Sequence, residues 1–158
     1  MPVVYIETSI VSYLRLQPSN QVVSAARQIL TRRWWEIERQ NYDLVTSQYV
    51  LDEAEQGDRV LAGERARALK NIPLLDLPPD VARLADELLA QAVLPPNARL
   101  DALHIAVAAF HGVDYLLTWN CAHIANARIL PRIREVLTEL GFSTPIICTP
   151  EEMVDEIA

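Results

Sequence analysis

The sequence predicts an α/β fold in which helices cover both faces of a central parallel sheet. Short apolar runs rich in β-branched residues alternate along the chain with longer amphipathic stretches, which is typical of strand–helix–strand units. The first run, Val3–Ile6, is continuously apolar, as expected for a strand buried on both faces. Because the 158 residues contain no linker, repeat or low-complexity segment, we expect a single domain over residues 1–158.

Up to residue 57, the pattern predicts strands at residues 3–6 and 44–46 with helices around them. A short helix is expected at residues 11–16. Ser47 would cap a further helix that ends near Gly57. Asn20 is a suitable N-cap for a long helix to residue 39, whose inner face would carry apolar side chains at helical spacing, namely Val23, Ala26, Ile29, Leu30 and Ile37.

The remainder of the chain continues the alternation. Asp58 would cap a helix that runs to residue 70. Pro79 suits the first turn of a helix to residue 91, and Pro95 and Pro96 mark a loop. The other expected elements are a short strand between prolines at 74–77, an apolar helix at 100–111 closed by Gly112, a strand at 115–119, a helix at 126–140 closed by Gly141, a strand at 145–148 and a short helix after Pro150.

Composition excludes several classes of function. A net charge of −7 argues against nucleic-acid binding through a broad basic surface, although not against binding through metal ions held by carboxylates. No apolar run is long enough to span a membrane and no signal peptide is visible, so a cytoplasmic protein is expected. Cys121 and Cys148 are far apart and match no metal or redox motif. No glycine-rich phosphate loop occurs.

Candidate site residues follow the predicted strands, because sites in open parallel sheets form beyond the carboxyl ends of the strands. Glu7, Thr8 and Ser9 follow the first strand. A carboxylate at the end of a buried strand is costly without a partner, so we favour a functional role for Glu7; the alternative is that it caps the next helix. Asp101 opens the apolar helix, where the helix dipole alone would favour an acid.

Two further positions stay open from spacing alone. Glu53 lies in an acidic run with Asp52 and Glu55, and nothing in the spacing selects one of them. Asn120 follows the strand at 115–119 and is either a turn residue or a neutral oxygen ligand for a hard cation. His123, in the same loop, is the only histidine considered for catalysis, since His104 and His111 are expected to pack against or cap a helix.

Four segments in order resemble the PIN domain of VapC-type toxins from toxin–antitoxin pairs. They are residues 5–10 (YIETSI), 47–54 (SQYVLDEA), 101–108 (DALHIAVA) and 115–120 (YLLTWN). The resemblance implies a PIN-like fold and selects Glu53 among the acids of its helix. It implies a metal-dependent ribonuclease that binds Mg²⁺ or Mn²⁺ to activate water, forms a homodimer and is neutralised by a cognate antitoxin.

The resemblance also implies a role for individual residues. Glu7, Glu53 and Asp101 would be the metal-binding carboxylates, with Asn120 at the fourth catalytic position. Mutual repulsion would raise the pKa values of the carboxylates until a cation binds. The supporting hydroxyl groups would belong to Thr8, Ser9 and Thr118.

Two positions depart from the usual pattern of this family. Glu7 replaces an aspartate and Asn120 replaces another, so binding of a second ion should be weaker. These departures support the alternative function, a non-catalytic PIN-like domain that binds RNA or a protein. Trp34 and Trp35 are adjacent on the long helix, which predicts that one of them lies at a dimer contact.

Overall fold

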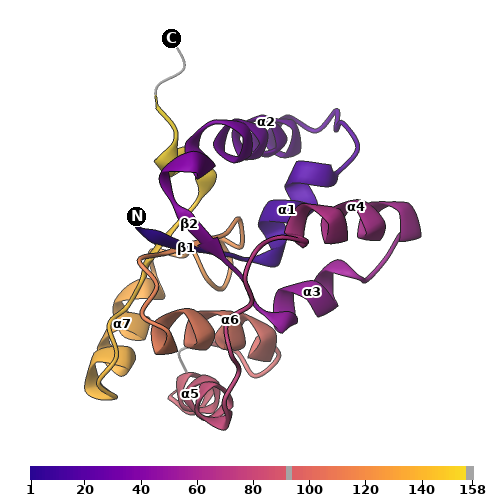
Figure 1. Cartoon of the computed structure of the whole chain (residues 1–158). Coiled ribbons are helices and arrows are strands. Elements are labelled where there is room, and N and C mark those ends of the chain that lie inside the picture. The colour runs from indigo at the N-terminus through magenta and orange to yellow at the C-terminus, as the bar shows by residue number, and fades with distance from the viewer. Residues whose placement is uncertain (92–93, 156–158) are drawn as a thin grey trace.

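A parallel sheet forms the centre of the protein (Figure 1) in the computed structural model, which describes residues 1–91 and 94–155. Its strands are β1 (Val3–Ile6), β2 (Asp43–Val45), β3 (Tyr115–Leu117) and β4 (Ile146–Cys148). They are all parallel and lie in the order β2-β1-β3-β4. The chain therefore passes from β1 to β2 on one side and crosses to β3 on the other. The carboxyl ends of the strands share one edge of the sheet, the carboxyl edge, where this reversal opens space for a site.

Helices cover both faces of the sheet. In Figure 1, α2 lies on one side, and α5, α6 and α7 lie on the other. The helical elements are α1 (Thr8–Arg15), α2 (Val22–Glu36), η1 (Glu38–Asn41), α3 (Gln48–Ala54), α4 (Arg59–Leu69), α5 (Pro79–Ala90), α6 (Arg99–Phe110), α7 (Leu130–Glu139) and η2 (Pro150–Met153). Within the described ranges, no helix is both long enough and apolar enough to cross a membrane.

The core is built around β1 and α6. Val4, Tyr5 and Ile6 are fully buried. Because consecutive side chains of a strand point to opposite faces, both faces of β1 are covered, as its continuous apolar run predicts. In α6, every residue from Ala102 to Ala109 is buried. At the carboxyl edge, Glu7 follows the end of β1 and Asp101 lies in the first turn of α6.

The prediction for the inner face of α2 is wrong for all but one of its residues. Val23, Ala26, Ile29 and Ile37 are exposed, at 60% for Ile29, and only Leu30 packs against the core; the buried residues are Gln28, Thr31, Trp34 and Trp35. Each indole has more area to bury than any single side chain of the aliphatic stripe. Gln28 and Thr31 are satisfied, because Gln28 Nε2 donates to the Gln17 carbonyl at 2.7 Å and Trp119 Nε1 donates to Thr31 Oγ1 at 2.8 Å, whereas the buried indole N–H of Trp34 has no partner among the described residues.

The burial of both tryptophans removes the reason given for a dimer contact. Trp34 stacks on Tyr42, and the guanidinium of Arg39 lies over the ring of Trp35. Both indoles are thus covered within one chain. The side-by-side pair on α2 does not leave one ring for a partner, and the dimer remains a prediction without this support.

Residues 74–77 do not form the predicted strand. Leu74 makes a single parallel bridge to Thr46, in which Leu75 N donates to the Thr46 carbonyl at 2.8 Å. The ladder goes no further, and the carbonyl of Asp76 is bound by His111 Nε2 at 2.6 Å. His111 is also the C-cap residue of α6, in agreement with the expectation that it packs against or caps a helix.

Several helix ends differ from the prediction. Asp58 caps α4 as expected, accepting from Leu61 N at 2.9 Å. Helix α2 begins at Val22 with no side-chain cap, so Asn20 is not its N-cap. Helix α1 begins earlier than residue 11 because Glu7 caps it. Helix α7 begins at Leu130 rather than at Asn126, whose amide instead donates to the Cys121 carbonyl at 2.9 Å.

Candidate active site

Glu7 is held at the carboxyl edge by neutral donors. It follows β1 directly and is the N-cap of α1, accepting from Ser9 N at 2.7 Å through Oε2. Thr118 Oγ1, at the end of β3, donates to Oε1 at 3.2 Å. The alternative in which Glu7 caps a helix is therefore realised. It does not explain the burial, however, because Glu7 is only 5% exposed and a cap is normally solvated.

Burial is the main influence on the charge of Glu7. It raises the pKa of this carboxyl above its ordinary value, against the opposing effects of the His104 ring and the Ser9 amide, and the charge of Glu53 raises it further. A desolvated carboxylate with no cation beside it is an unfavourable arrangement. Glu7 is thus a position where binding a cation would recover solvation free energy.

Glu53 is the acid of helix α3 that faces the site, since Asp52 and Glu55 are exposed. Its Oε1 accepts from Thr8 Oγ1 at 2.7 Å and lies 2.5 Å from His104 Nε2. Burial alone would raise its pKa, but these hydrogen bonds and the charge of His104 together lower it below its ordinary value. The expectation that repulsion raises the pKa of every carboxylate is wrong for Glu53, because the histidine compensates its charge.

A buried polar chain stands behind Glu53. The Tyr5 hydroxyl lies 2.9 Å from His104 Nδ1 and 2.7 Å from Ser47 Oγ. With Glu53 ionised, Nε2 of His104 must donate to it. A neutral ring then accepts from the Tyr5 hydroxyl at Nδ1, whereas a protonated ring donates to the Tyr5 oxygen. This series of hydrogen bonds links α3 to β1 and α6, and it fixes Glu53 in place.

Sequence reasoning missed this chain. The sequence predicts that His104 packs against or caps a helix, that Tyr5 belongs to a strand and that Ser47 is a helix cap. The available signal was that a histidine on an otherwise apolar helix, three positions after Asp101, must find a partner when buried. What the sequence does not show is that this partner lies on α3.

Asp101 belongs to a second cluster, across the end of β3. Asn120 Nδ2 donates to its Oδ1 at 2.9 Å, and His123 Nδ1 lies 3.0 Å from its Oδ2. Asn120 Oδ1 in turn accepts from His123 N at 3.1 Å, which fixes the loop. Asn120 therefore acts as a turn residue and contacts Asp101 as well.

Hydroxyl groups join the Asp101 cluster to Glu7. Asn120 N donates to Thr118 Oγ1 at 2.9 Å, and Thr118 bonds Glu7. Ser9 Oγ accepts from Trp119 N at 2.7 Å, which ties the start of α1 to the chain after β3. The structure thus brings all of the predicted positions to one edge, including the hydroxyls of Thr8, Ser9 and Thr118.

The donor set fits a hard divalent cation in its chemistry. Carboxylate and amide groups lie at the same edge of the sheet, and the donors recorded around Glu7 are neutral. Over residues 1–91 and 94–155, however, no three Asp, Glu, His or Cys side chains are placed to hold one ion together. The reason is local: Glu53 is turned toward His104 and Asp101 toward Asn120 and His123. Mg²⁺ keeps several waters and needs only one or two direct carboxylates, so its chemistry does not require three protein ligands.

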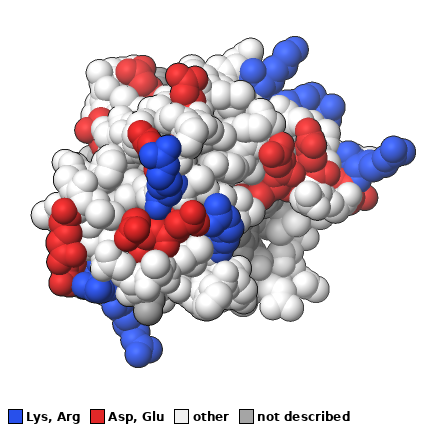
Figure 2. Space-filling view, turned by 90° about the horizontal axis from the view of Figure 1, so that it is seen from below, with Lys and Arg blue, Asp and Glu red and all other residues white. Residues whose placement is uncertain are grey.

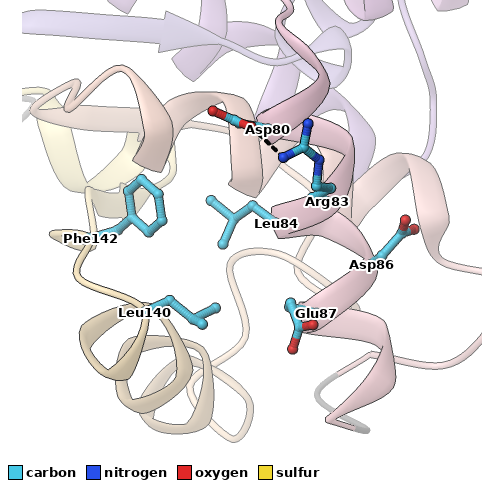
Figure 3. A pocket seen from close by; sticks show the side chains of 7 residues that line it. All are labelled: Asp80, Arg83, Leu84, Asp86, Glu87, Leu140 and Phe142. Carbon is cyan, nitrogen blue, oxygen red and sulfur yellow. Dashed lines mark ion pairs between the residues drawn. The ribbon is translucent and has the colours of Figure 1, made fainter.

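Another hollow of the molecule does not match the chemistry of a divalent-cation site. It lies between α5 and the chain that leaves α7 (Figure 3), lined by Leu84, Leu140 and Phe142 with acids and Arg83 at the rim. Arg83 is paired there with Asp80 at 2.9 Å. The rim charges are solvated, and the floor is apolar. On the face seen in Figure 2, acidic and basic side chains are interspersed.

Comparison with known proteins supports the fold. No family model and no curated protein matches the chain. Its structure resembles a chain of "Crystal structure of VapBC2 from Rickettsia felis bound to a DNA fragment from their promoter", with a TM-score of 0.59, 15% identity and coverage of 93% of this chain and 98% of that one. At this identity the likeness shows the fold alone. The expected fold, α/β and PIN-like with a parallel central sheet, is confirmed.

Neutralising the two glutamates should have opposite effects on the metal-free protein. Because the pKa of Glu7 is raised, its ionisation lowers stability as the pH rises above the ordinary value of 4.5; Glu7→Gln should raise the melting temperature at pH 7. Because the pKa of Glu53 is lowered, it adds stability above 4.5 that is lost as the pH falls through its folded pKa. Glu53→Gln should cost about 1.5–3 kcal/mol at pH 7.

Thermal unfolding in EDTA from pH 4 to 8 would measure both effects. Glu55→Gln is the matched control, because the same change at an exposed position should stay within about 0.5 kcal/mol of the wild type. A destabilising effect of Glu7→Gln at pH 7, equal to that of Glu53→Gln, would contradict this account of the site.

Proposed function

We propose that the protein is a metal-dependent endoribonuclease whose centre lies at the carboxyl edge of the sheet. The observation that carries the proposal is Glu7, a carboxylate buried at the end of the central strand whose recorded hydrogen-bond donors are neutral and whose pKa is raised by burial and by the charge of Glu53. Asp101 lies on the other side of Thr118, through Asn120. A divalent cation is the simplest partner for such a group of oxygens.

Glu7, Glu53 and Asp101 would hold Mg²⁺ or Mn²⁺, and Asn120 would orient Asp101. When bound, the ion supplies an activated water and stabilises charge on the phosphate. The chain's own residues position the ligands. Ser9 and Thr118 fix the carboxylate of Glu7, and Thr8 and His104 fix that of Glu53.

The electrostatics support a cation-mediated contact with nucleic acid. The protein carries a net charge of −7, so a phosphate would be repelled from the carboxyl edge until a cation is bound there. RNA rather than DNA is proposed from the resemblance to VapC-type toxins alone, and the likeness to a chain of the VapBC2 structure supports only the fold that this resemblance implies.

We also propose a cognate antitoxin and a homodimer as partners, as that resemblance implies. Exposed aliphatic side chains on α2 and directly after it, Val22, Val23, Ile29 and Ile37, are available for contact with a partner protein. Sedimentation of the purified protein, alone and co-expressed with an adjacent gene product, would test both partners.

A second candidate function is binding of RNA or protein without cleavage. One observation favours it: in the described part of the chain no three ligand side chains share a metal position. Measurements of Mn²⁺ affinity and of RNA binding in EDTA separate the two functions. A non-catalytic domain would bind RNA equally well in EDTA.

Replacing Asp101 with Asn should abolish most of the nuclease activity while the fold survives. The change removes a charge but keeps the size of the side chain, and a group essential to a metal centre is expected to lower kcat by about 100-fold or more. Cleavage of a single-stranded RNA with Mn²⁺ would be measured. Asp80→Asn, at an exposed position on α5, is the matched control and should cleave like the wild type. Unchanged cleavage by Asp101→Asn would remove this residue from the centre.

Metal number provides a separate test of Asn120. An aspartate at this position would add a charge where the amide offers only a dipole. The wild type should therefore bind one Mn²⁺ ion with useful affinity, and Asn120→Asp should strengthen binding of a second. Calorimetric titration of both proteins would decide this. Two equally tight ions in the wild type, or identical titrations of the two proteins, would sink the idea.

A further inference from the structure

A hollow of about 450 Å³ adjoins Glu53 at the carboxyl edge. Its lining residues come from α1, from α3 with the turn after it, and from the first turn of α6: Thr8, Tyr49, Asp52, Glu53, Gln56 and Leu100. The volume lies within the range of about 300–1,000 Å³ typical of sites for small molecules. Glu53 and Thr8 belong to the site described above, so the hollow is continuous with it.

Helical spacing arranges the chemistry of one wall. Tyr49, Asp52, Glu53 and Gln56 follow one another at i, i+3, i+4 and i+7, and therefore lie on one face of α3 and its extension. The far wall is Leu100, which is 36% exposed and immediately precedes Asp101. An aromatic ring and an aliphatic side chain thus border the hollow, and carboxylate and amide groups are set beside them.

This lining matches a nucleobase and not a phosphate. Asp52 and Glu53 give the hollow a negative potential that repels an anion. A flat neutral ring can stack on Tyr49, as unpaired bases do on aromatic side chains in single-stranded nucleic-acid sites. Such stacking requires an unpaired base, which RNA supplies in loops and single strands.

Asp52 gives the hollow a preference among bases. Gln48 Nε2 donates to Asp52 Oδ1 at 2.9 Å, which orients the carboxylate. An ionised carboxylate only accepts hydrogen bonds. Guanine presents two adjacent N–H donors on its Watson–Crick edge, whereas uracil presents one donor between two acceptors that the carboxylate would repel. The Gln56 amide has both a donor and an acceptor to complete the contact.

We propose that this hollow is a base subsite that binds an unpaired guanine beside the scissile phosphate, with Tyr49 stacking on the base and Asp52 accepting from its N–H groups. The inference rests on the proposed ribonuclease function, since it names the part of the substrate that lies next to Glu53. It makes Asp52 the specificity-determining residue of α3, beside the metal-binding Glu53.

Equilibrium binding of nucleosides tests the subsite without metal or cleavage. Guanosine and uridine would be titrated into the metal-free protein and followed by NMR chemical shifts. The wild type should bind guanosine about tenfold more tightly than uridine, with the largest shifts at Tyr49 and Gln56. Asp52→Asn should abolish the preference. Tyr49→Ala should weaken binding of both nucleosides, whereas Tyr49→Phe, which keeps the ring, should bind both like the wild type.

Glu55→Gln is the matched control, because it removes one exposed charge from the same helix outside the hollow and should keep the preference. Equal affinities for the two nucleosides, an unchanged preference in Asp52→Asn, or no shift up to the solubility limit of guanosine would each overturn the subsite. Failure of the ribonuclease function is a different result: it would appear as absent RNA cleavage by a wild type that still prefers guanosine.

Discussion

The burial of the Glu7 carboxylate at the end of the central strand is the constraint on which the candidate site depends. Strand β1 has neighbours on both sides and helices on both faces, so a charged group at its end exchanges water for protein. The amide of Ser9 and the hydroxyl of Thr118 offset part of that cost, but both are neutral. The part of the desolvation cost that is not offset raises the pKa of Glu7. A cation at this edge would remove the penalty, which makes metal binding and stability two aspects of one electrostatic arrangement.

The protein treats its two glutamates differently. Glu53 is held by His104, and the buried hydroxyls of Tyr5 and Ser47 hold the ring of His104 in turn. Its pKa is lowered where that of Glu7 is raised. An ionised carboxylate that is already held in place therefore lies beside a buried one whose charge its neutral partners do not compensate. The hollow next to Glu53 adjoins this pre-ordered side of the site.

Much of the fold followed from local pattern. The runs that became β1 and α6 are apolar on all sides and had one interpretation, and the acids Glu7 and Asp101 were found because they border those runs. The prediction for helix α2 failed because its sequence offers two competing faces. The choice between them depends on contacts with Trp119, which is remote in sequence, and with the loop before α2. The partners of His104 are equally remote, so its role could not be read from spacing.

The central claim is that the carboxyl edge of the sheet binds a divalent cation. A crystal structure of the wild type soaked in Mn²⁺, with anomalous data collected at the manganese edge, tests it most directly. The account predicts one strong anomalous peak in direct contact with Glu7 and Glu53, with Glu53 partly withdrawn from His104 or bridging to the ion through its second oxygen. Manganese bound only at exposed acids such as those of α5, with Glu7 still free of metal, would contradict it.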